Sequence, residues 1–360
     1  MRKYYPGITL FKLGGSLLVL VAHIMLIRYM TLLPGQALVQ FASLATRIVV
    51  PCFYVIAGFL AYKGWSHAAS SRSYMQKYLK RLVIVYCFFC CFFVAEHIVP
   101  KLISDGLSAG NLFVQAKILF IAVFLNGPFI QFWFIPPLIF GLLAAYWFFE
   151  KQYVRLAVIL ALIGFVAIQF VSGSLMKVFG VTAASIPFMN PDYMEYLDLL
   201  VTRYIGFGFT FVAAGVFLAK YEEQFMQIRI RPIIIFAIVF TVIETALLLQ
   251  FSEWTTDYKF AFSMLPNTLL IFYGILRMKS PAVQTYHKRI NLFSIVTFFG
   301  HILFMRLNFL LMGWDAASMN IGQDFMLLFM TLIECVAATA FFSLVGSKSL
   351  AAKRTRNLPQ

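Results

Sequence analysis

Long apolar runs separated by short connectors constrain this chain more than any other feature of its sequence. The first run extends from Ile8 to Leu32, and similar runs follow it as far as residue 346. A helix needs about 20 apolar residues to cross a bilayer, and lipid offers an open backbone no hydrogen-bond partner. The sequence therefore predicts an all-α polytopic membrane helix bundle of about ten transmembrane helices, with no soluble domain.

Composition supports this class of protein. Apolar residues make up 62% of the 360 positions and charged residues 12%, whereas a soluble domain has about half and about a quarter. We expect a transmembrane domain over residues 1–347 and a basic cytoplasmic tail over residues 348–360. The predicted spans are 8–32, 38–62, 78–99, 131–149, 154–172, 198–219, 232–251, 258–276, 291–313 and 325–346.

Basic residues in the connectors predict the orientation of the chain. They gather in alternate connectors and in the two tails, and the other connectors carry only Lys101, Lys117, Lys177 and Lys259. Cytoplasmic loops of membrane proteins carry an excess of Lys and Arg, so both termini are predicted to be cytoplasmic. The basic residues that give the net charge of +15 lie in these short connectors and tails, so the charge does not indicate a nucleic-acid partner.

One further apolar segment, Asn111–Gly127, would reverse this orientation if it crossed the membrane completely. Every later basic connector would then face outward. The segment is also short for a full crossing. We therefore expect a re-entrant or interfacial helix on the outer side.

The cysteines do not predict a metal site. Cys87, Cys90 and Cys91 lie in one apolar run that ends near His97, and their spacing matches no standard zinc pattern. Thiols in such a run behave as small apolar residues, so we expect neither a bound metal nor a disulfide framework.

Ionisable residues inside spans are the strongest indication of function, because a charge in the bilayer is costly and usually faces a site or a pathway. Lys12 and His23 are eleven residues apart, close to three helical turns, so they share one helix face about 16 Å apart. Lys12 either extends to the headgroups or lines a site. His23 either bonds a neighbouring helix or accepts a proton, and a second histidine in a span, His301, favours proton chemistry.

Arg47 precedes Pro51 in the second predicted span. Proline frees a backbone carbonyl and bends a helix, and an arginine nearby either binds an anion or pairs with Glu244 or Glu334. The sequence leaves these readings open.

Trp133 and Arg203 fall near the outer interface. An aromatic belt explains Trp133 by position alone, and a site on the outer side is the alternative. The chain contains no Walker A loop and no GxSxG elbow, which argues against ATP-driven transport and an α/β-hydrolase.

Several local patterns resemble the membrane-bound acyltransferase-3 family. In the family's first span, an Arg is followed by ten residues and then a His; here Lys12 stands at the Arg position and His23 at the His position. Lys77–Arg81 is similar to the family's basic run. Arg47–Phe59 looks like its Arg-apolar-Pro-x-Phe-Phe-x-x-Ser-Gly-Phe run. Phe132–Pro136 is similar to its Trp-Phe-apolar run.

His301 matches a Tyr-x-x-His-Pro stretch in part, because Phe298 replaces the Tyr and Ile302 follows the His. Lys12 in place of Arg keeps the charge but loses bidentate recognition of phosphate or carboxylate. Ala57 replaces the usual Ser. Within the family, the short chain resembles members of exopolysaccharide operons, including the intercellular-adhesin type.

The resemblance implies an O-acyltransferase that moves an acetyl or succinyl group from acyl-CoA to a hydroxyl of a cell-surface polysaccharide or a lipid-linked glycan. Acyl-CoA is then a co-substrate, with no bound cofactor. The resemblance implies a multi-pass protein of the bacterial cytoplasmic membrane, with glycosyltransferases as candidate partners. We assign His23 and His301 to catalysis, Lys12 and Arg47 to the donor, and Trp133 and Arg203 to the acceptor side.

Two other functions fit the buried charges. An exporter of polysaccharide or lipid-linked glycan needs a polar pathway, and its transport would not depend on acyl-CoA. A non-catalytic scaffold for a glycan synthase would tolerate substitution of the buried charges. The sequence specifies neither the acyl group and the acceptor nor whether transfer is direct or passes through a covalent intermediate.

Overall fold

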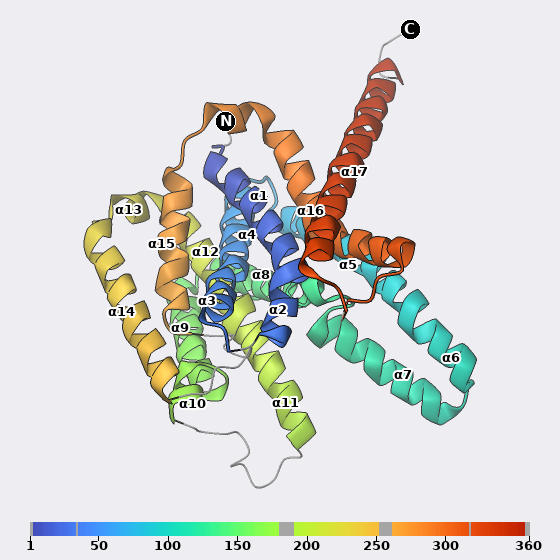
Figure 1. Ribbon diagram of the computed structural model, residues 1–360. Coiled ribbons are helices and arrows are strands. Elements are labelled where there is room, and N and C mark those ends of the chain that lie inside the picture. The colour runs from blue at the N-terminus through green and yellow to red at the C-terminus, as the bar shows by residue number, and fades with distance from the viewer. Residues whose placement is uncertain (1–2, 34, 180–190, 252–260, 317, 357–360) are drawn as a thin grey trace. The chain divides into compact units, whose positions relative to one another are not determined.

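The computed structural model describes residues 3–33, 35–179, 191–251, 261–316 and 318–356. The regular elements in these ranges are helices, which confirms the predicted all-α class (Figure 1). The helices form two compact units. The first comprises Met1–Thr46 and Gly274–Gln360, and the second comprises Arg47–Tyr273.

The described helices confirm a multi-pass membrane protein. Nine of them are long and apolar enough to cross a bilayer: Pro6–Met30, Ser71–Asp105, Ala109–Asn126, Ile130–Glu150, Val154–Val171, Glu195–Lys220, Ile230–Leu248, Pro281–Met312 and Ile321–Val345. Val49–Trp65 and Met264–Arg277 are shorter apolar helices. Each of the ten predicted spans, and the segment 111–127, overlaps one of these helices.

The first unit is a group of long helices. The π-helical turn η1 interrupts the first helix, and α16 packs against both α1 and α17. Ser280 caps α16 by accepting a hydrogen bond from the Val283 N–H at 3.4 Å, and α16 ends at Gly313 with a left-handed backbone. The elements are α1 (Pro6–Val21), η1 (Ala22–Leu26), α2 (Ile27–Leu32), α3 (Ala37–Thr46), α16 (Pro281–Met312) and α17 (Ile321–Arg356).

The second unit is built around α12, which packs against α4, α8 and α9. The π-helical segment η6 precedes α12 and packs against α8 and α9. The elements are α4 (Val49–Trp65), α5 (Ser71–Phe93), η2 (Val94–Ile98), α6 (Val99–Asp105), α7 (Ala109–Ile121), η3 (Ala122–Asn126), η4 (Ile130–Phe132), α8 (Ile135–Glu150), α9 (Val154–Val171), α10 (Ser174–Phe179), α11 (Pro191–Leu200), η6 (Val201–Phe209), α12 (Thr210–Lys220), α13 (Glu222–Gln227), α14 (Ile230–Phe251) and α15 (Met264–Arg277), whose last turn belongs to the first unit.

The predicted continuous span 38–62 was wrong, because the chain breaks between α3 and α4. Arg47 and Ile48 form a turn. Pro51 has no N–H to donate to the carbonyl of residue 47, and its ring would clash with that carbonyl in a continuous helix. The bend expected from Pro51 is therefore a complete interruption, and Arg47 lies at it.

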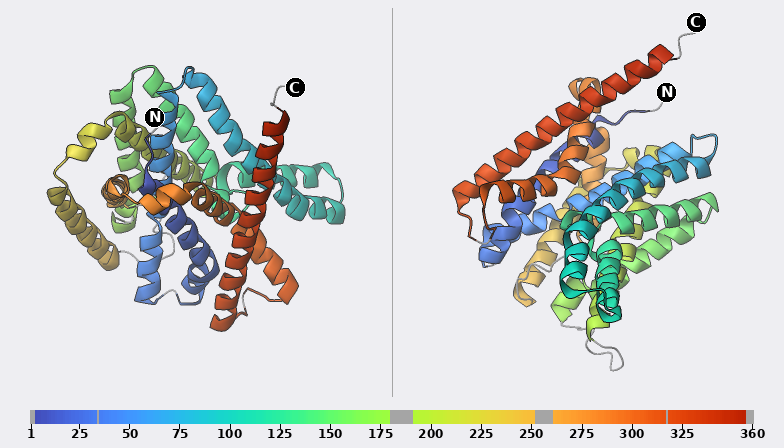
Figure 2. Two further views of the ribbon diagram at one scale, coloured as in Figure 1. Left: turned by 90° about the horizontal axis from the view of Figure 1, so that it is seen from above. Right: turned by 90° about the vertical axis from the view of Figure 1, so that its right-hand side faces the viewer.

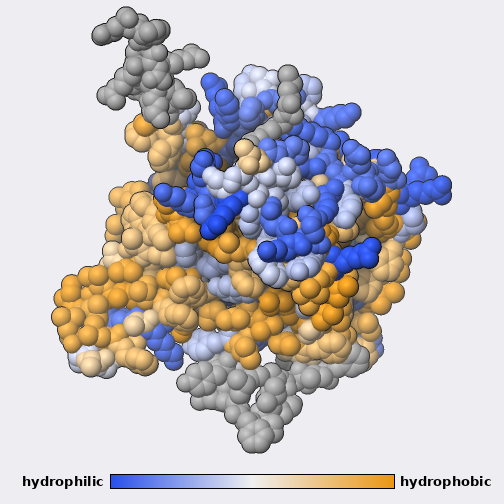
Figure 3. Space-filling view, turned by 180° about the vertical axis from the view of Figure 1, so that it is seen from behind, coloured by the Kyte–Doolittle hydropathy of each residue, from blue (hydrophilic) through white to orange (hydrophobic). Residues whose placement is uncertain are grey.

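A helical hairpin follows α5. The helix Ser71–Asp105 is 35 residues long, and α7 then runs back beside α6 (Figures 1 and 2). Apolar side chains of the hairpin are strongly exposed, among them Ile103 at 79% and Phe113 at 74%. A soluble surface would not carry them, and the space-filling view shows broad hydrophobic areas (Figure 3). Whether Asn111–Gly127 is re-entrant stays a prediction.

Two predicted segments lie partly outside the described residues: the start of the span 258–276 and much of the connector 172–198. At the other end of the chain, α17 continues through Arg356. Most of the predicted tail 348–360 is therefore helical.

Close packing of α4 on α12 yields a stability prediction. A Cβ at Gly58 would overlap the backbone carbonyl of Val212, whereas a Cβ at Gly274 meets open space. We expect Gly58→Ala to lower the free energy of unfolding by roughly 1–3 kcal/mol through overpacking. Gly274→Ala should change it by less than about 1 kcal/mol. Thermal unfolding in detergent measures both, and equal effects would contradict this packing.

Candidate active site

His23 and His301 form a hydrogen-bonded pair in the first unit. His23 lies on η1 and His301 on α16, and 2.9 Å separates His23 Nδ1 from His301 Nε2. Their rings are stacked, with centroids 5.1 Å apart and an angle of 21° between the planes. His301 is completely buried and His23 is partly exposed. The structure thus brings together two residues that are 278 positions apart.

The partners of this pair determine where each neutral ring carries its proton. His301 Nδ1 lies 2.8 Å from the Thr297 carbonyl oxygen, and a carbonyl only accepts, so Nδ1 must be the donor. The Nε2 atom of neutral His301 then holds a lone pair, and His23 Nδ1–H donates to it. His23 Nε2 consequently keeps a lone pair of its own. The arrangement leaves His23 with one nitrogen able to accept a proton.

The π-helical turn η1 was not predicted. A π turn inserts an extra residue into a helix, and such turns are frequent at functional sites. Arg203 also lies on a π-helical segment, η6. No periodicity in the apolar sequence around His23 or Arg203 indicates either turn.

Lys12 lies on α1, eleven residues before His23, and its side chain is half-buried. It makes no hydrogen bond or ion pair with any residue that the structure describes. A half-buried ammonium group of this kind is free to meet an anionic ligand or headgroup.

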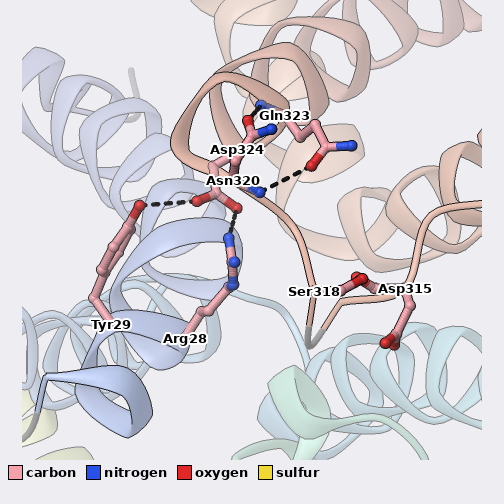
Figure 4. Close-up of polar contacts among 7 residues, drawn as sticks. All are labelled: Arg28, Tyr29, Asp315, Ser318, Asn320, Gln323 and Asp324. Atoms are coloured by element: carbon pink, nitrogen blue, oxygen red, sulfur yellow. Dashed lines mark hydrogen bonds and ion pairs between the residues drawn. The ribbon is translucent and has the colours of Figure 1, made fainter.

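Arg28 and Asp324 form a buried ion pair in the same unit (Figure 4). Arg28 NH1 lies 2.5 Å from Asp324 Oδ1, and the Tyr29 hydroxyl donates to Oδ2 at 3.0 Å. Asp324 is 1% exposed and lies in the first turn of α17, where the helix dipole favours an anion. Arg28 falls within the predicted span 8–32, whereas Asp324 lies one residue before the predicted span 325–346 and was not predicted as its partner.

The start of α17 beside this ion pair is a reciprocal cap. The Gln323 N–H donates to Asn320 Oδ1 at 3.0 Å, and the Asn320 N–H donates to Gln323 Oε1 at 2.8 Å (Figure 4). This is the capping-box arrangement, which satisfies two helix-terminal donors. It fixes where α17 begins and therefore holds Asp324 in place.

Two other carboxylates inside spans are bound by neutral groups. Glu334 accepts a hydrogen bond from Asn308 Nδ2 at 2.9 Å in the first unit. Glu244 in the second unit accepts from the Ser174 hydroxyl and from the backbone N–H groups of Phe262 and Ser263. Glu244 thereby supplies partners to the chain just before α15 begins.

Trp133 and Arg203 come together in the second unit. The Arg203 guanidinium lies over the Trp133 ring, 5.1 Å from its centroid, in cation–π geometry. Arg203 NH1 also donates to the Leu125 carbonyl and, at 3.2 Å, to Asn126 Oδ1. Arg203 therefore links the end of η3 to the segment that precedes α8.

Three tyrosine hydroxyls hold the ends of this segment. Tyr204 donates to the Phe124 carbonyl at 2.6 Å, Tyr86 to that of Val123 at 2.5 Å, and Tyr54 to that of Phe134 at 2.9 Å. The segment between η3 and α8 is consequently fixed at both ends. Sequence reasoning missed all three tyrosines, because each bonds a backbone carbonyl far away in the chain.

Arg47 lies at the break before α4, and its side chain is half-buried. Among the described residues, no group of three or more His, Cys, Asp or Glu is placed to hold a metal ion.

These features define a multi-pass membrane protein with a hydrogen-bonded histidine pair in one unit and an Arg–Trp pair in the other. The acyltransferase-3 family model, described as an acyltransferase domain, matches residues 5–340. The chain therefore belongs to the membrane-bound acyltransferase-3 family. No curated protein and no solved structure matches the chain.

The Arg28–Asp324 pair supports a second stability prediction. Arg28→Gln leaves a buried carboxylate without its cation, so we expect a loss of about 3–5 kcal/mol in the free energy of unfolding. The double variant Arg28→Gln, Asp324→Asn should recover much of that loss, because neither charge is then unpaired. A double-mutant cycle from unfolding curves tests this. Additive losses would contradict the ion pair.

Proposed function

We propose that this chain transfers an acetyl or succinyl group from acyl-CoA to a hydroxyl of a cell-surface polysaccharide or a lipid-linked glycan. Family membership supports acyl transfer in general. The observation that carries the proposal is the hydrogen-bonded series Thr297–His301–His23, which leaves His23 Nε2 as a proton acceptor.

A sugar hydroxyl needs such a group to become a nucleophile. His23 Nε2 takes the hydroxyl proton as the oxygen attacks the thioester carbonyl. The C–S bond then breaks, and the leaving thiolate takes the proton from Nε2. His301 Nε2 accepts the Nδ1–H hydrogen bond throughout and stabilises the imidazolium that forms on His23. Both partners of this pair are buried or half-buried, where such bonds are stronger than in water.

The donor side is assigned to Lys12 and Arg47. CoA carries phosphates, and Lys and Arg are the side chains that bind phosphate. Lys12 makes no hydrogen bond or ion pair within the described part of the chain. In the proposed orientation, both termini are in the cytoplasm of a bacterial cell, and the Lys12 end of α1 faces the compartment that contains CoA.

The acceptor side is assigned to Trp133 and Arg203. An aromatic face and a guanidinium are suited to a sugar, because the ring packs on its C–H groups and the N–H groups bond its hydroxyls. The two side chains are already held against each other.

Replacing His23 tests the catalytic assignment. We expect His23→Gln to lower transfer from labelled acetyl-CoA to a glycan acceptor by about 10²–10⁴-fold, because a general base contributes that much. His67→Gln is the matched control, since His67 is exposed and bonds the Lys63 carbonyl. Thermal unfolding must show that both variants fold. Full activity in His23→Gln would remove the assignment.

The role of His301 is tested by comparing two replacements. The amide oxygen of His301→Gln can still accept from His23 Nδ1–H, whereas His301→Leu offers no acceptor. We expect the Gln variant to retain at least about tenfold more kcat than the Leu variant, in keeping with a lost hydrogen bond to a developing charge. Equal kcat values in two folded variants would show that His301 does not position His23.

A further inference from the structure

Gln131 is the least satisfied amide in the described chain. Its side chain is 4% exposed, and both Oε1 and Nε2 are buried without a hydrogen-bond partner. Buried polar groups are almost always bonded, and an unbonded one is destabilising. Gln169 differs in part: it is 0% exposed and its Nε2 also has no partner in the described chain, but its Oε1 accepts from the Ser174 N–H at 3.1 Å.

The position of Gln131 is determined by its turn. It lies on η4, two residues before Trp133, in the segment whose ends are held by Arg203, Tyr204 and Tyr54. Gly127 has a φ of 78°, and a Cβ there would overlap backbone atoms of Phe129, Phe132 and Trp133. The turn is therefore folded tightly on itself. In this turn, neither amide atom of Gln131 has a partner among the described residues.

The group without a partner at this turn is a neutral carboxamide. Arg203 already donates to the Leu125 carbonyl and to Asn126 Oδ1, and its charge faces the Trp133 ring. The Gln131 carboxamide, which has two donors and an accepting oxygen, keeps its whole hydrogen-bonding capacity unused in the described chain. Such a group is complementary to a ligand that presents a donor and an acceptor side by side.

We propose that Gln131 is a specificity-determining residue of the acceptor site. Its carboxamide bonds a neutral donor–acceptor pair on the acceptor, either two neighbouring hydroxyls or an amide, beside the Trp133 ring. The inference rests on the proposed function and narrows its acceptor to a neutral sugar unit. It also explains why a costly orphan amide is kept in this turn, since function and stability conflict at binding sites.

The variant Gln131→Met distinguishes the effect of the amide on stability from its effect on acceptor binding. Methionine fills a similar volume without polar atoms, so the variant should be as stable as the wild type or more so. With an N-acetylglucosamine oligomer or a glucose oligomer as acceptor, we expect the acceptor KM to rise about tenfold or more, as for two lost hydrogen bonds. The KM for acetyl-CoA should not change. Gln131→Glu, which keeps the shape but loses the N–H donors, should show the same rise.

Gln169→Met is the matched control. It removes a buried amide that is bonded to the chain, so we expect lower thermal stability and an unchanged acceptor KM. An unchanged acceptor KM in Gln131→Met, or a rise in the KM for acetyl-CoA instead, would overturn the inference.

Calorimetric binding of the same two oligomers, without acetyl-CoA, separates this inference from the proposed function. Weaker binding by Gln131→Met than by the wild type, in a protein that transfers no acyl group, would support the inference while the proposed function fails. Normal acyl transfer, with equal binding of the oligomers by both proteins, would support the proposed function and overturn the inference about Gln131. Wild-type protein that binds inorganic phosphate but neither oligomer would overturn the neutral-ligand assignment.

Discussion

Hydrocarbon offers no hydrogen bond, so each polar group within the spans of this protein must find its partner inside the protein or in a ligand. This constraint accounts for the polar contacts of the structure. His23 bonds His301, Arg28 pairs with Asp324, and Asn308 donates to Glu334. Among the side chains with groups that lack a partner in the described chain, Lys12 and Gln131 indicate where ligands are expected.

The membrane architecture was predictable because it depends on local quantities. The length and hydropathy of each run determine a span, and the helices bear out the predicted all-α bundle. Pro51 predicted a bend of the helix near Arg47, but the sequence did not show that one helix would end there and another begin. The π turns that carry His23 and Arg203 have no recognised pattern in the sequence, so they could not be predicted from it.

The site residues could be predicted from their residue type and their position within a span, whereas the residues that they contact could not. A histidine within a span is conspicuous, but its contact with another histidine 278 positions away depends on how α1 packs on α16. Asp324 was overlooked because it lies at a helix start, where an acidic residue is ordinary. Gln131 is uncharged and precedes an aromatic run, so the sequence does not mark it, and what distinguishes it is that neither amide atom has a partner among the described residues.

Thr297 and His301 together fix the tautomer of His23 and leave its Nε2 atom as a base. Solid-state ¹⁵N NMR of histidine-labelled protein in lipid measures this directly, with His23→Gln and His301→Gln variants for assignment. At neutral pH we predict a protonated Nδ1 and an unprotonated Nε2 in both rings, with magnetisation transfer from the His23 Nδ1–H proton to His301 Nε2. A proton on His23 Nε2, or no transfer between the two rings, would contradict the account.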